Sequence, residues 1–405
     1  MHYTTPLVLA VLVLGYAVVS ERVNRLYVAP ALIFVILGMA LGPFGLHLLE
    51  AGSGTEGYTV LAQLALTVIL FCQAAKMRFD RIGPHGPVTL RLLIIGIPLT
   101  VLLGAVTAAA LLPVLPWWEA VCLGAIVAPT EVALIESLME DRRIPERVRH
   151  ALSVESGFND GFALAALLIA LGLASARTDP GKGHWAWFIF STEILSLLAG
   201  GLVGLVGGAI VTWSRRREWM TDTWAQLATL ALAFICFQLG ERIEASGFVA
   251  AFTGGLAFSF VSRRCSEDEP PTQVSDAAGQ LLELLVFAMF GAFAVIDGWR
   301  QANWRIVLFA LLALFAVRMV SVLIALVATD LPMSSRVFIG WFGPRGIGTV
   351  VLGLLVVNRG ELESIGLIST VVVVTVTLSL VLHSLSTAPG IRMQASARVA
   401  TPSSS

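Results

Sequence analysis

The chain has 405 residues, of which 57% are hydrophobic and 13% charged, and its formal net charge is −1. Soluble domains are closer to half apolar and a quarter charged, and a globule of this length could not bury so much apolar surface. The composition therefore excludes a soluble enzyme, a disordered chain and a disulfide scaffold. The near-neutral charge, with no Lys/Arg block that looks like a nucleic-acid surface, also excludes nucleic-acid binding. A polytopic membrane protein remains.

The first apolar run, which starts near Pro6, has no basic segment before it and no small-residue cleavage site after it. We therefore expect a retained membrane helix rather than a signal peptide. The four cysteines form no CxxC pair or Cys/His cluster, so the sequence predicts neither a disulfide framework nor a zinc site, and no cofactor.

Polar and Gly/Pro-rich breaks divide the chain into thirteen apolar segments, most of them near the length of about 20 residues that crosses a bilayer. Their limits are 5–20, 28–49, 57–75, 89–112, 117–139, 149–175, 185–213, 222–240, 246–262, 274–296, 303–329, 333–357 and 364–385. The sequence thus predicts an all-α protein with thirteen transmembrane helices within residues 1–385. Residues 386–405 are expected to form a short, disordered cytoplasmic tail.

Most of the 26 Lys and Arg residues fall in alternate loops, on one side of this predicted topology. Cytoplasmic loops carry such an excess. We therefore expect a multi-pass protein of the cell membrane with its N-terminus outside and its C-terminus in the cytoplasm.

Ionisable residues within apolar segments are costly and mark functional sites. The densest group lies at the start of the sixth segment and reads Ser153-Val-Glu155-Ser156-Gly157-Phe158-Asn159-Asp160-Gly161. On a helix, Ser156 and Asp160 are i,i+4 neighbours with Asn159 beside them. These oxygen atoms suit a small, hard cation or a proton, so the sequence predicts a monovalent cation bound at Asp160.

Glu155 is five residues before Asp160, so the two carboxylates point to different faces of the helix. We expect Glu155 to pair with an intramembrane arginine, and the sequence leaves open whether this is Arg318 or Arg345. A purely structural ion pair is a serious alternative role for Arg318.

Two segments are interrupted. The fifth reads Ala128-Pro129-Thr130-Glu131 and the twelfth reads Gly343-Pro344-Arg345-Gly346-Ile347-Gly348. Interrupted helices at matching positions of two halves point to a transporter site. We therefore predict an inverted repeat of helices 1–6 and 8–13, joined by helix 7, with discontinuous helices 5 and 12. Two unrelated proline kinks are the alternative.

Residues at these interruptions have predicted roles. A broken helix exposes positive half-dipoles at new N-termini and negative ones at new C-termini. Glu131 can offset the first kind and Arg345 the second, and Thr130 could offer its hydroxyl and freed carbonyl to an ion.

Together these motifs resemble the monovalent cation/proton antiporters of the CPA1 branch, the NhaP-type sodium/proton exchangers related to the animal NHE exchangers. The similarity includes Leu37-Gly38-Met39-Ala40-Leu41-Gly42-Pro43, both motifs of helices 5 and 6, Gly247-Phe248-Val249-Ala250-Ala251-Phe252-Thr253-Gly254-Gly255 and Gly343-Pro344-Arg345-Gly346. These occur in family order over most of residues 1–390.

The resemblance implies a homodimer with an NhaA-like fold, in which dimerisation and core subdomains interleave in sequence and the core moves as an elevator. It assigns cation and proton binding to Asp160 with Asn159, polar ligands to Thr130 and Ser156, a structural acid to Glu155, and the partner arginines to Arg318 and Arg345. The family's usual Thr-Asp-Pro is here Thr130-Glu131-Val132. We count Glu131 among the predicted cation- and proton-binding residues, with an offset of the helix dipole as its alternative role, so ion selectivity is open.

The predicted function is exchange of Na⁺, Li⁺ or K⁺ for H⁺ by competition at Asp160. A single ionising carboxylate favours one-for-one, electroneutral exchange. The alternatives are a solute carrier for an organic ion with Arg345 as receptor, a channel, or an intramembrane hydrolase. Against a hydrolase, only Asp160 is clearly available mid-segment, no HExxH is present, and no histidine is expected deep beside a serine nucleophile.

Overall fold

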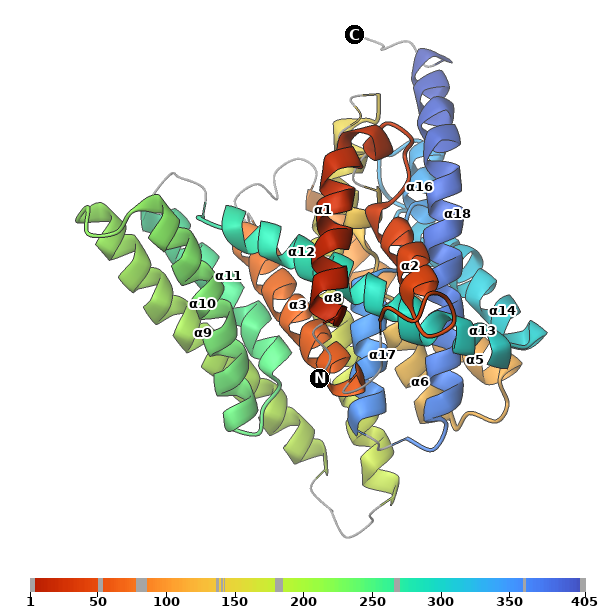
Figure 1. Ribbon diagram of the computed structural model, residues 1–405, viewed down its shortest axis with the longest axis horizontal. Helices are drawn as coiled ribbons and strands as arrows, with labels where there is room; N and C mark the ends of the chain where they lie inside the picture. Colours follow the sequence, from red (N-terminus) through yellow and green to blue (C-terminus); the bar gives the residue numbers. More distant parts are fainter. Residues whose placement is uncertain are drawn as a thin grey trace. The chain divides into compact units, whose positions relative to one another are not determined.

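The computed structural model describes residues 4–49, 54–77, 86–135, 138–139, 141, 143–178, 185–265, 270–359 and 362–400. Every regular element in this part of the chain is helical (Figure 1). In chain order the elements are α1 (Thr4–Asn24), α2 (Pro30–Leu41), α3 (Gly54–Lys76), α4 (Gly86–Arg91), η1 (Leu92–Gly96), α5 (Ile97–Leu111), α6 (Trp117–Ile126), η2 (Val132–Ile135), α8 (Glu146–Thr178), α9 (Trp185–Arg216), α10 (Asp222–Arg242), α11 (Gly247–Cys265), α12 (Gln273–Phe290), η3 (Gly291–Val295), α13 (Ile296–Gln301), α14 (Trp304–Leu311), η4 (Leu312–Val317), α15 (Arg318–Ala325), α16 (Met333–Trp341), α17 (Ile347–Arg359) and α18 (Ile365–Ala400).

These helices follow the apolar segments of the sequence. Within the described ranges, nine helices are long and apolar enough to cross a membrane. Three shorter apolar helices, Pro30–Leu41, Trp117–Ile126 and Ile347–Val357, fall in the second, fifth and twelfth segments. The all-α membrane fold is confirmed, whereas the count of thirteen spans and the inverted repeat with its discontinuous helices 5 and 12 stay predictions.

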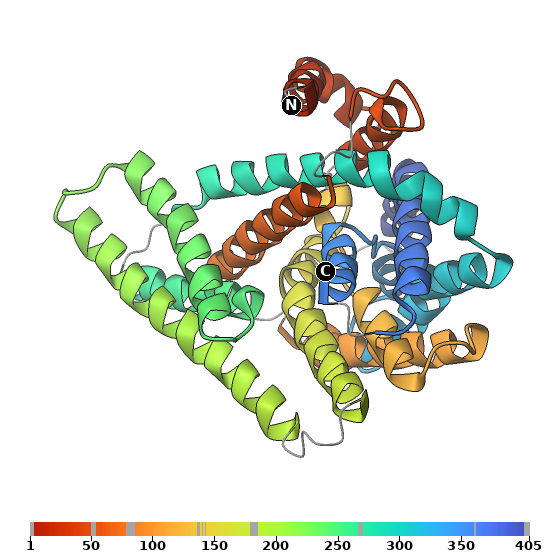
Figure 2. The same ribbon diagram turned by 60° about the horizontal axis from the view of Figure 1, so that its bottom comes forward.

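The chain divides into two compact units whose segments interleave in sequence. The first contains residues 1–59, 84–159 and 284–405, and the second contains residues 60–83 and 160–283. Within the second unit, α9, α10 and α11 pack side by side (Figure 2). Gly200 and Gly204 on α9 permit this contact, because a Cβ atom at either position would overlap the α11 backbone at Ala250 or Gly254.

In the first unit, α2 crosses the chain at the junction of α12 and η3. Gly38 lies so close to the Ala288 carbonyl, and Gly291 so close to that of Val35, that neither position has room for a Cβ atom. Small residues let helix backbones approach in this way inside membranes. The Leu37–Pro43 motif therefore has a packing role at Gly38.

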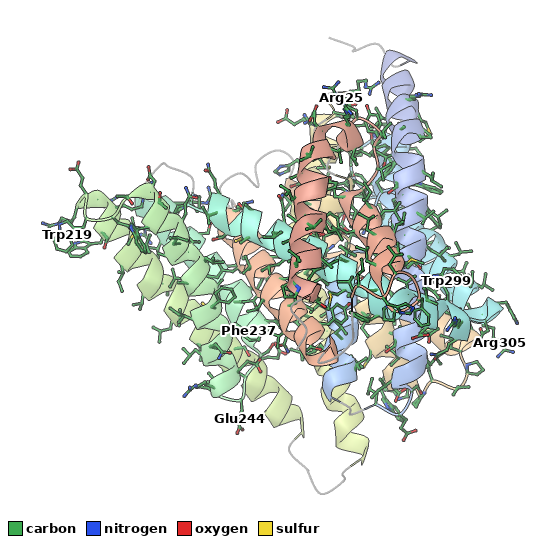
Figure 3. All side chains as sticks on the ribbon, viewed as in Figure 1. Arg25, Trp219, Phe237, Glu244, Trp299 and Arg305 are labelled. Atoms are coloured by element: carbon green, nitrogen blue, oxygen red, sulfur yellow. The ribbon has the colours of Figure 1, made fainter. Side chains whose placement is uncertain are left out.

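The surface of the described helices is apolar where a soluble protein would be charged. On α1, Leu7, Leu14 and Val18 are more than 60% exposed, and large apolar patches of this kind mark contact with lipid or protein. Trp219, 70% exposed, and Glu244 lie at opposite ends of α10 (Figure 3). Tryptophan near a helix end is typical of the membrane–water interface.

The last helix, α18, extends past residue 385, where we expect the final span to end, and reaches Ala400 with Pro389 inside it. Packing explains the extension, because Thr387 and Ile391 are both 1% exposed. Gly390 also lies directly against the Phe342 ring. The first part of the segment expected to be a disordered tail is therefore helical and packed, while residues 401–405 lie outside the described part.

Replacement of Gly38 by alanine tests the close crossing of α2. We expect a Cβ atom at this position to push α2 from the Ala288 carbonyl and to lower the stability by about 1–3 kcal/mol. Gly15→Ala on α1 is the control, because nothing lies within 4 Å of its Cβ position and alanine favours a helix over glycine. The measurement is thermal unfolding of both purified variants in detergent, and equal unfolding temperatures would contradict the crossing.

Candidate functional site at two interrupted helices

The fifth segment stops being an α-helix in its middle. Helix α6 ends at Ile126, and the chain continues without regular structure until η2 begins at Val132. The intervening Thr130 and Glu131 are each 5% exposed. Their backbone groups are thus buried without a helical partner, a situation tolerated at membrane depth only against protein or a cavity.

Side chains of α8 bind the backbone of this interruption. Ser156 Oγ donates to the Thr130 carbonyl at 2.9 Å, and Asn159 Nδ2 donates to the same oxygen at 3.0 Å and to Thr130 Oγ1 at 2.6 Å. A carbonyl oxygen has two lone pairs, so both are occupied. Contrary to the expectation from the sequence, this carbonyl oxygen has no lone pair left for an ion, because two side chains of α8 donate to it.

The same contacts fix the orientation of the Asn159 amide. Two oxygen atoms face its nitrogen, which identifies that atom as Nδ2. The remaining Oδ1 is buried and accepts no hydrogen bond from the described residues. Thr130 therefore turns the amide so that an acceptor oxygen is left for another group.

Asp160 follows Asn159 directly on the continuous helix α8 and is 3% exposed. It is the first residue of the second unit, whereas the other predicted site residues belong to the first. Ser156 lies one helical turn before it, as the i,i+4 spacing predicts. A carboxylate buried to this degree is costly unless it is hydrogen-bonded, paired with a positive charge or protonated.

Glu155 pairs with Arg318, which resolves the alternative that the sequence left open. Arg318 Nη1 donates to Glu155 Oε1, and Nη2 donates to Oε2 at 2.8 Å. The two side chains are 2% and 1% exposed. Arg318 begins α15 directly after the π-helical turn η4. Its bidentate ion pair with Glu155 therefore joins α15 to α8.

The twelfth segment is interrupted between α16, which ends at Trp341, and α17, which begins at Ile347. The two interruptions meet here, since the Glu131 N–H donates to the Pro344 carbonyl at 2.8 Å. The Glu131 side chain packs against Gly346, where a Cβ atom would overlap it. Glu131 thus lies beside the N-terminus of α17, where a negative charge is favourable.

Arg345 is fully buried, and its guanidinium reaches back to the α16 end of the same interruption. Its Nη1 donates to the Gly343 carbonyl at 3.0 Å, just past the C-terminus of α16. Cations are favourable near helix C-termini. The described residues provide no hydrogen-bond partner for its Nε and Nη2 atoms.

Sequence analysis missed two residues on α18. Contrary to expectation, His383 is 1% exposed and lies beside a serine, with its Nδ1 atom 3.3 Å from Ser379 Oγ. The i,i+4 spacing of Ser379 and His383 on one helix face was the available signal. The serine is committed elsewhere, because its Oγ accepts the Arg345 N–H at 2.6 Å.

Glu119, in the first turn of α6, is a further buried acid that the sequence did not single out. It is 1% exposed, and its Oε1 accepts the Glu363 N–H at 2.8 Å, two residues before α18 begins. It therefore ties the start of α6 to the start of α18. No sequence signal separates this role from that of an ordinary helix-end carboxylate.

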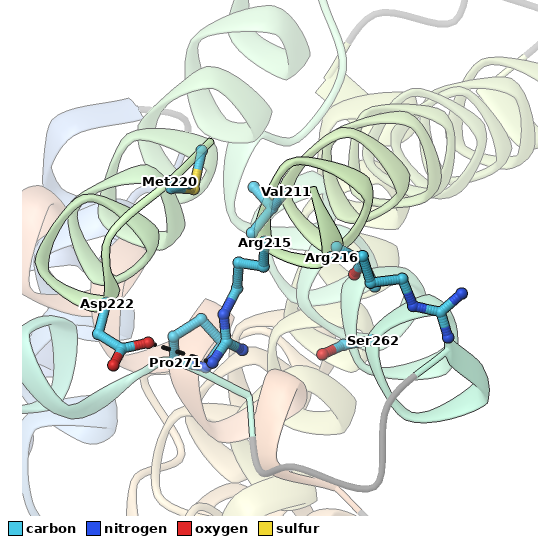
Figure 4. A pocket seen from close by; sticks show the side chains of 8 residues that line it. Val211, Arg215, Arg216, Met220, Asp222, Ser262 and Pro271 are labelled. Atoms are coloured by element: carbon cyan, nitrogen blue, oxygen red, sulfur yellow. Dashed lines mark hydrogen bonds and ion pairs between the residues drawn. The ribbon is translucent and has the colours of Figure 1, made fainter. Parts of the chain in front are cut away.

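A cavity of about 220 Å³ lies in the second unit at the end of α9. Val211, Thr212, Arg215, Arg216, Met220, Asp222, Ser262 and Pro271 line it (Figure 4). Arg215 bonds Asp222 across it at 3.3 Å. None of the predicted site residues lines it, and a dehydrated monovalent ion needs far less space.

The buried pair of Glu155 and Arg318 is open to a stability test. We expect Glu155→Gln alone to lower the free energy of unfolding by about 3–5 kcal/mol, because Arg318 then stays buried and uncompensated. The double variant Glu155→Gln/Arg318→Gln should recover much of that loss. Thermal unfolding of the purified proteins measures both.

The matched control is the exposed pair of Glu21 and Arg25, whose side chains are 75% and 77% exposed. Exposed pairs contribute at most about 1 kcal/mol, so Glu21→Gln should leave the unfolding temperature almost unchanged. Similar losses from Glu21→Gln and Glu155→Gln would show that the buried pair is not a stabilising link.

Solved structures share this arrangement of helices. The sodium proton antiporter MjNhaP1 from Methanocaldococcus jannaschii at pH 8 superposes with a TM-score of 0.77 over 96% of this chain and 97% of that one, at 19% identity. A second structure of MjNhaP1, from electron microscopy, gives a TM-score of 0.78 over the full length of both chains, at 18% identity. At such identities the likeness establishes the fold alone.

Curated relatives match most of the chain. The K⁺/H⁺ antiporter NhaP of Alkalimonas amylolytica is 26% identical over 353 residues, which is 86% of this chain and 60% of the relative. The Na⁺/H⁺ antiporter of Saccharomyces cerevisiae is 26% identical over 86% of this chain and 37% of its own length. The chain thus spans about 60% or less of the length of these two relatives.

The family model described as sodium/hydrogen exchanger, transmembrane, matches residues 8–392, nearly the whole chain. This stretch contains both interrupted segments, the Asn159–Asp160 pair on α8 and the arginines of α15 and of the second interruption. The chain belongs to the transmembrane sodium/hydrogen exchanger family.

Proposed function

We propose that this protein is a secondary transporter that exchanges a monovalent cation for a proton, with both ions competing for Asp160. The observation that supports this proposal most directly is the buried Asn159–Asp160 pair on α8. Thr130 orients the Asn159 amide so that its Oδ1 atom is left as an acceptor. An amide oxygen and a carboxylate are hard ligands of the kind that small cations prefer.

The stoichiometry of the exchange follows from the number of carboxylates that a cation or a proton can neutralise. Glu155 is committed to Arg318, and Asn159 is neutral at every pH. Asp160 alone is then neutralised, either by one proton or by one cation. Both loaded forms carry the same charge, so exchange is one for one and electroneutral.

The cation is Na⁺, Li⁺ or K⁺. The curated relatives are named both K⁺/H⁺ and Na⁺/H⁺ antiporters, which supports a monovalent cation without selecting one. Glu131 stands where the resemblance leads us to expect aspartate. Its packing against Gly346, beside α17, supports a role in offsetting the helix dipole.

The remaining features belong to the same proposal. We place the protein in the cell membrane as a homodimer, with its N-terminus outside and its C-terminus in the cytoplasm. The excess of Lys and Arg in alternate loops supports the orientation, and the exposed apolar faces of α1 and α9 support contact with lipid or a second subunit. Lipid, the cation and the proton are its partners.

The rival functions fit the site less well. As a receptor for an organic anion, Arg345 would need an open position, but it is fully buried and bonds the Gly343 carbonyl. A serine hydrolase would use Ser379 and His383, yet the serine oxygen is buried and accepts the Arg345 N–H. Neither rival uses Asn159 and Asp160.

Proton flux in proteoliposomes tests the proposal. With an internal pH dye, addition of Na⁺, Li⁺ or K⁺ to vesicles containing the purified chain should move protons, and Asp160→Asn should abolish this flux. Asp297→Asn is the control, since Asp297 is exposed and pairs only weakly with Arg300 at 3.8 Å. Cation-driven flux that persists in Asp160→Asn would refute the assignment of Asp160.

A membrane-potential dye in the same vesicles tests the stoichiometry. Because one positive charge exchanges for another, we expect proton flux without a change in membrane potential, and clamping the potential with valinomycin and K⁺ should leave the Na⁺-driven or Li⁺-driven rate unchanged. A cation-dependent potential would contradict one-for-one exchange while leaving the antiport itself intact.

A further inference from the structure

Helix α18 binds both sides of the second interruption with two side chains one turn apart. Ser379 Oγ accepts the N–H of Arg345 at 2.6 Å, just before α17 begins. His383 Nε2 lies 3.0 Å from the carbonyl oxygen of Trp341, the last residue of α16. Helix α18 therefore contacts one backbone donor and one backbone acceptor at this interruption, and the Trp341 carbonyl also accepts the Gly343 N–H at 3.0 Å.

Ser379 and His383 also contact each other on α18. The Ser379 hydroxyl accepts from Arg345, so its own proton is available to His383 Nδ1, which lies 3.3 Å from Oγ. Nδ1 also lies 2.9 Å from the Ser379 carbonyl oxygen. The two ring nitrogens thus face two carbonyl oxygens, and a neutral ring donates to one of them at a time. The tautomer with its proton on Nε2 donates to the Trp341 carbonyl at 3.0 Å.

Packing holds the two side chains in place. Ser379 is fully buried and His383 is 1% exposed. The imidazole ring stacks on Phe315 of η4, with 5.9 Å between ring centroids and 25° between ring planes, and the Phe342 ring lies 6.5 Å away. Phe315 also stacks on Trp341 at 4.5 Å. The ring thus has little freedom to turn from the interruption.

The contact reaches the first interruption through the backbone. Arg345, which Ser379 holds, is preceded by Pro344, whose carbonyl accepts the Glu131 N–H. Glu131 in turn follows Thr130, the residue that orients the Asn159 amide. Only one peptide unit separates each of these bonds from the next. A shift of the Arg345 N–H therefore moves the group that sets the direction of Asn159 Oδ1.

We propose, on the basis of the antiport function above, that Ser379 and His383 are positioning residues for transport, which hold the interruption between α16 and α17 and through it Thr130 and Asn159. In this proposal neither side chain binds the transported cation or the transported proton. Their loss is expected to weaken cation binding rather than merely to loosen the fold.

Substitutions with matched reach test the histidine. Glutamine can place its amide nitrogen where His383 has Nε2, whereas asparagine reaches only the position of Nδ1. We expect His383→Asn and His383→Leu to raise the KM for the cation about five- to tenfold, the effect of losing one hydrogen bond. His383→Gln should stay within about twofold of the native value. Rates at saturating cation, per folded protein, should change little.

Ser379→Ala is compared with Ser384→Ala, which removes a similar bond from the same helix. Ser384 Oγ accepts the Ala29 N–H at 3.3 Å, at the start of the uninterrupted helix α2. Both variants should lose some thermal stability, but only Ser379→Ala should raise the KM. Equal KM values for the two serine variants, or a failure of His383→Gln to differ from His383→Asn, would overturn the positioning role.

Amide hydrogen exchange provides a readout that does not depend on transport. In Ser379→Ala and His383→Leu, peptides containing Glu131 and Arg345 should exchange faster than in the native protein, while Ser384→Ala should affect only the start of α2. If the native chain moves no protons in response to cations, the antiport proposal fails. Unchanged exchange at Glu131 in Ser379→Ala would overturn the positioning proposal in that case as well.

Discussion

Inside a membrane, backbone N–H and C=O groups have no water to bind, so a helix can be interrupted only where other protein groups satisfy its freed ends. The two interruptions in this chain obey that constraint in detail. The Thr130 carbonyl is bound by Ser156 and Asn159, and the Glu131 N–H by Pro344. The second interruption is closed by two side chains of α18. Each break is thus tied to another element, and the two are tied to each other.

The same constraint explains how the buried charges are divided. Glu155 and Arg318 form a bidentate ion pair that joins α8 to α15, and their two charges neutralise each other. Glu131 and Arg345 lie at the positive and negative ends of half-helices. Asp160 follows Asn159 on α8, and Asn159 Oδ1 accepts no hydrogen bond from the described residues because Thr130 orients the amide. This is the place at which we propose that one exchangeable positive charge binds.

The constraints on helix packing in a membrane explain why the fold is shared with solved structures of low sequence identity. At 18–19% identity the helices still superpose over nearly the whole chain, because a membrane fold requires apolar helices and a few close crossings rather than a particular set of core residues. Gly38 against Ala288 and Gly200 against Ala250 are two such crossings. The fold alone does not establish transport; family membership and the residues around Asn159 and Asp160 support the proposed antiport.

The sequence by itself determined the membrane class, the position of both interruptions and the candidate residues, because hydropathy, proline and isolated charge are local properties that a linear chain displays. It could not decide between Arg318 and Arg345 as the partner of Glu155, since that choice depends on which helix lies beside α8. Nor could it show that α8 occupies the Thr130 carbonyl, that His383 lies beside Ser379 at a helix break, or that α18 runs on to Ala400. These are contacts between segments far apart in sequence, and only the packing of the helices creates them.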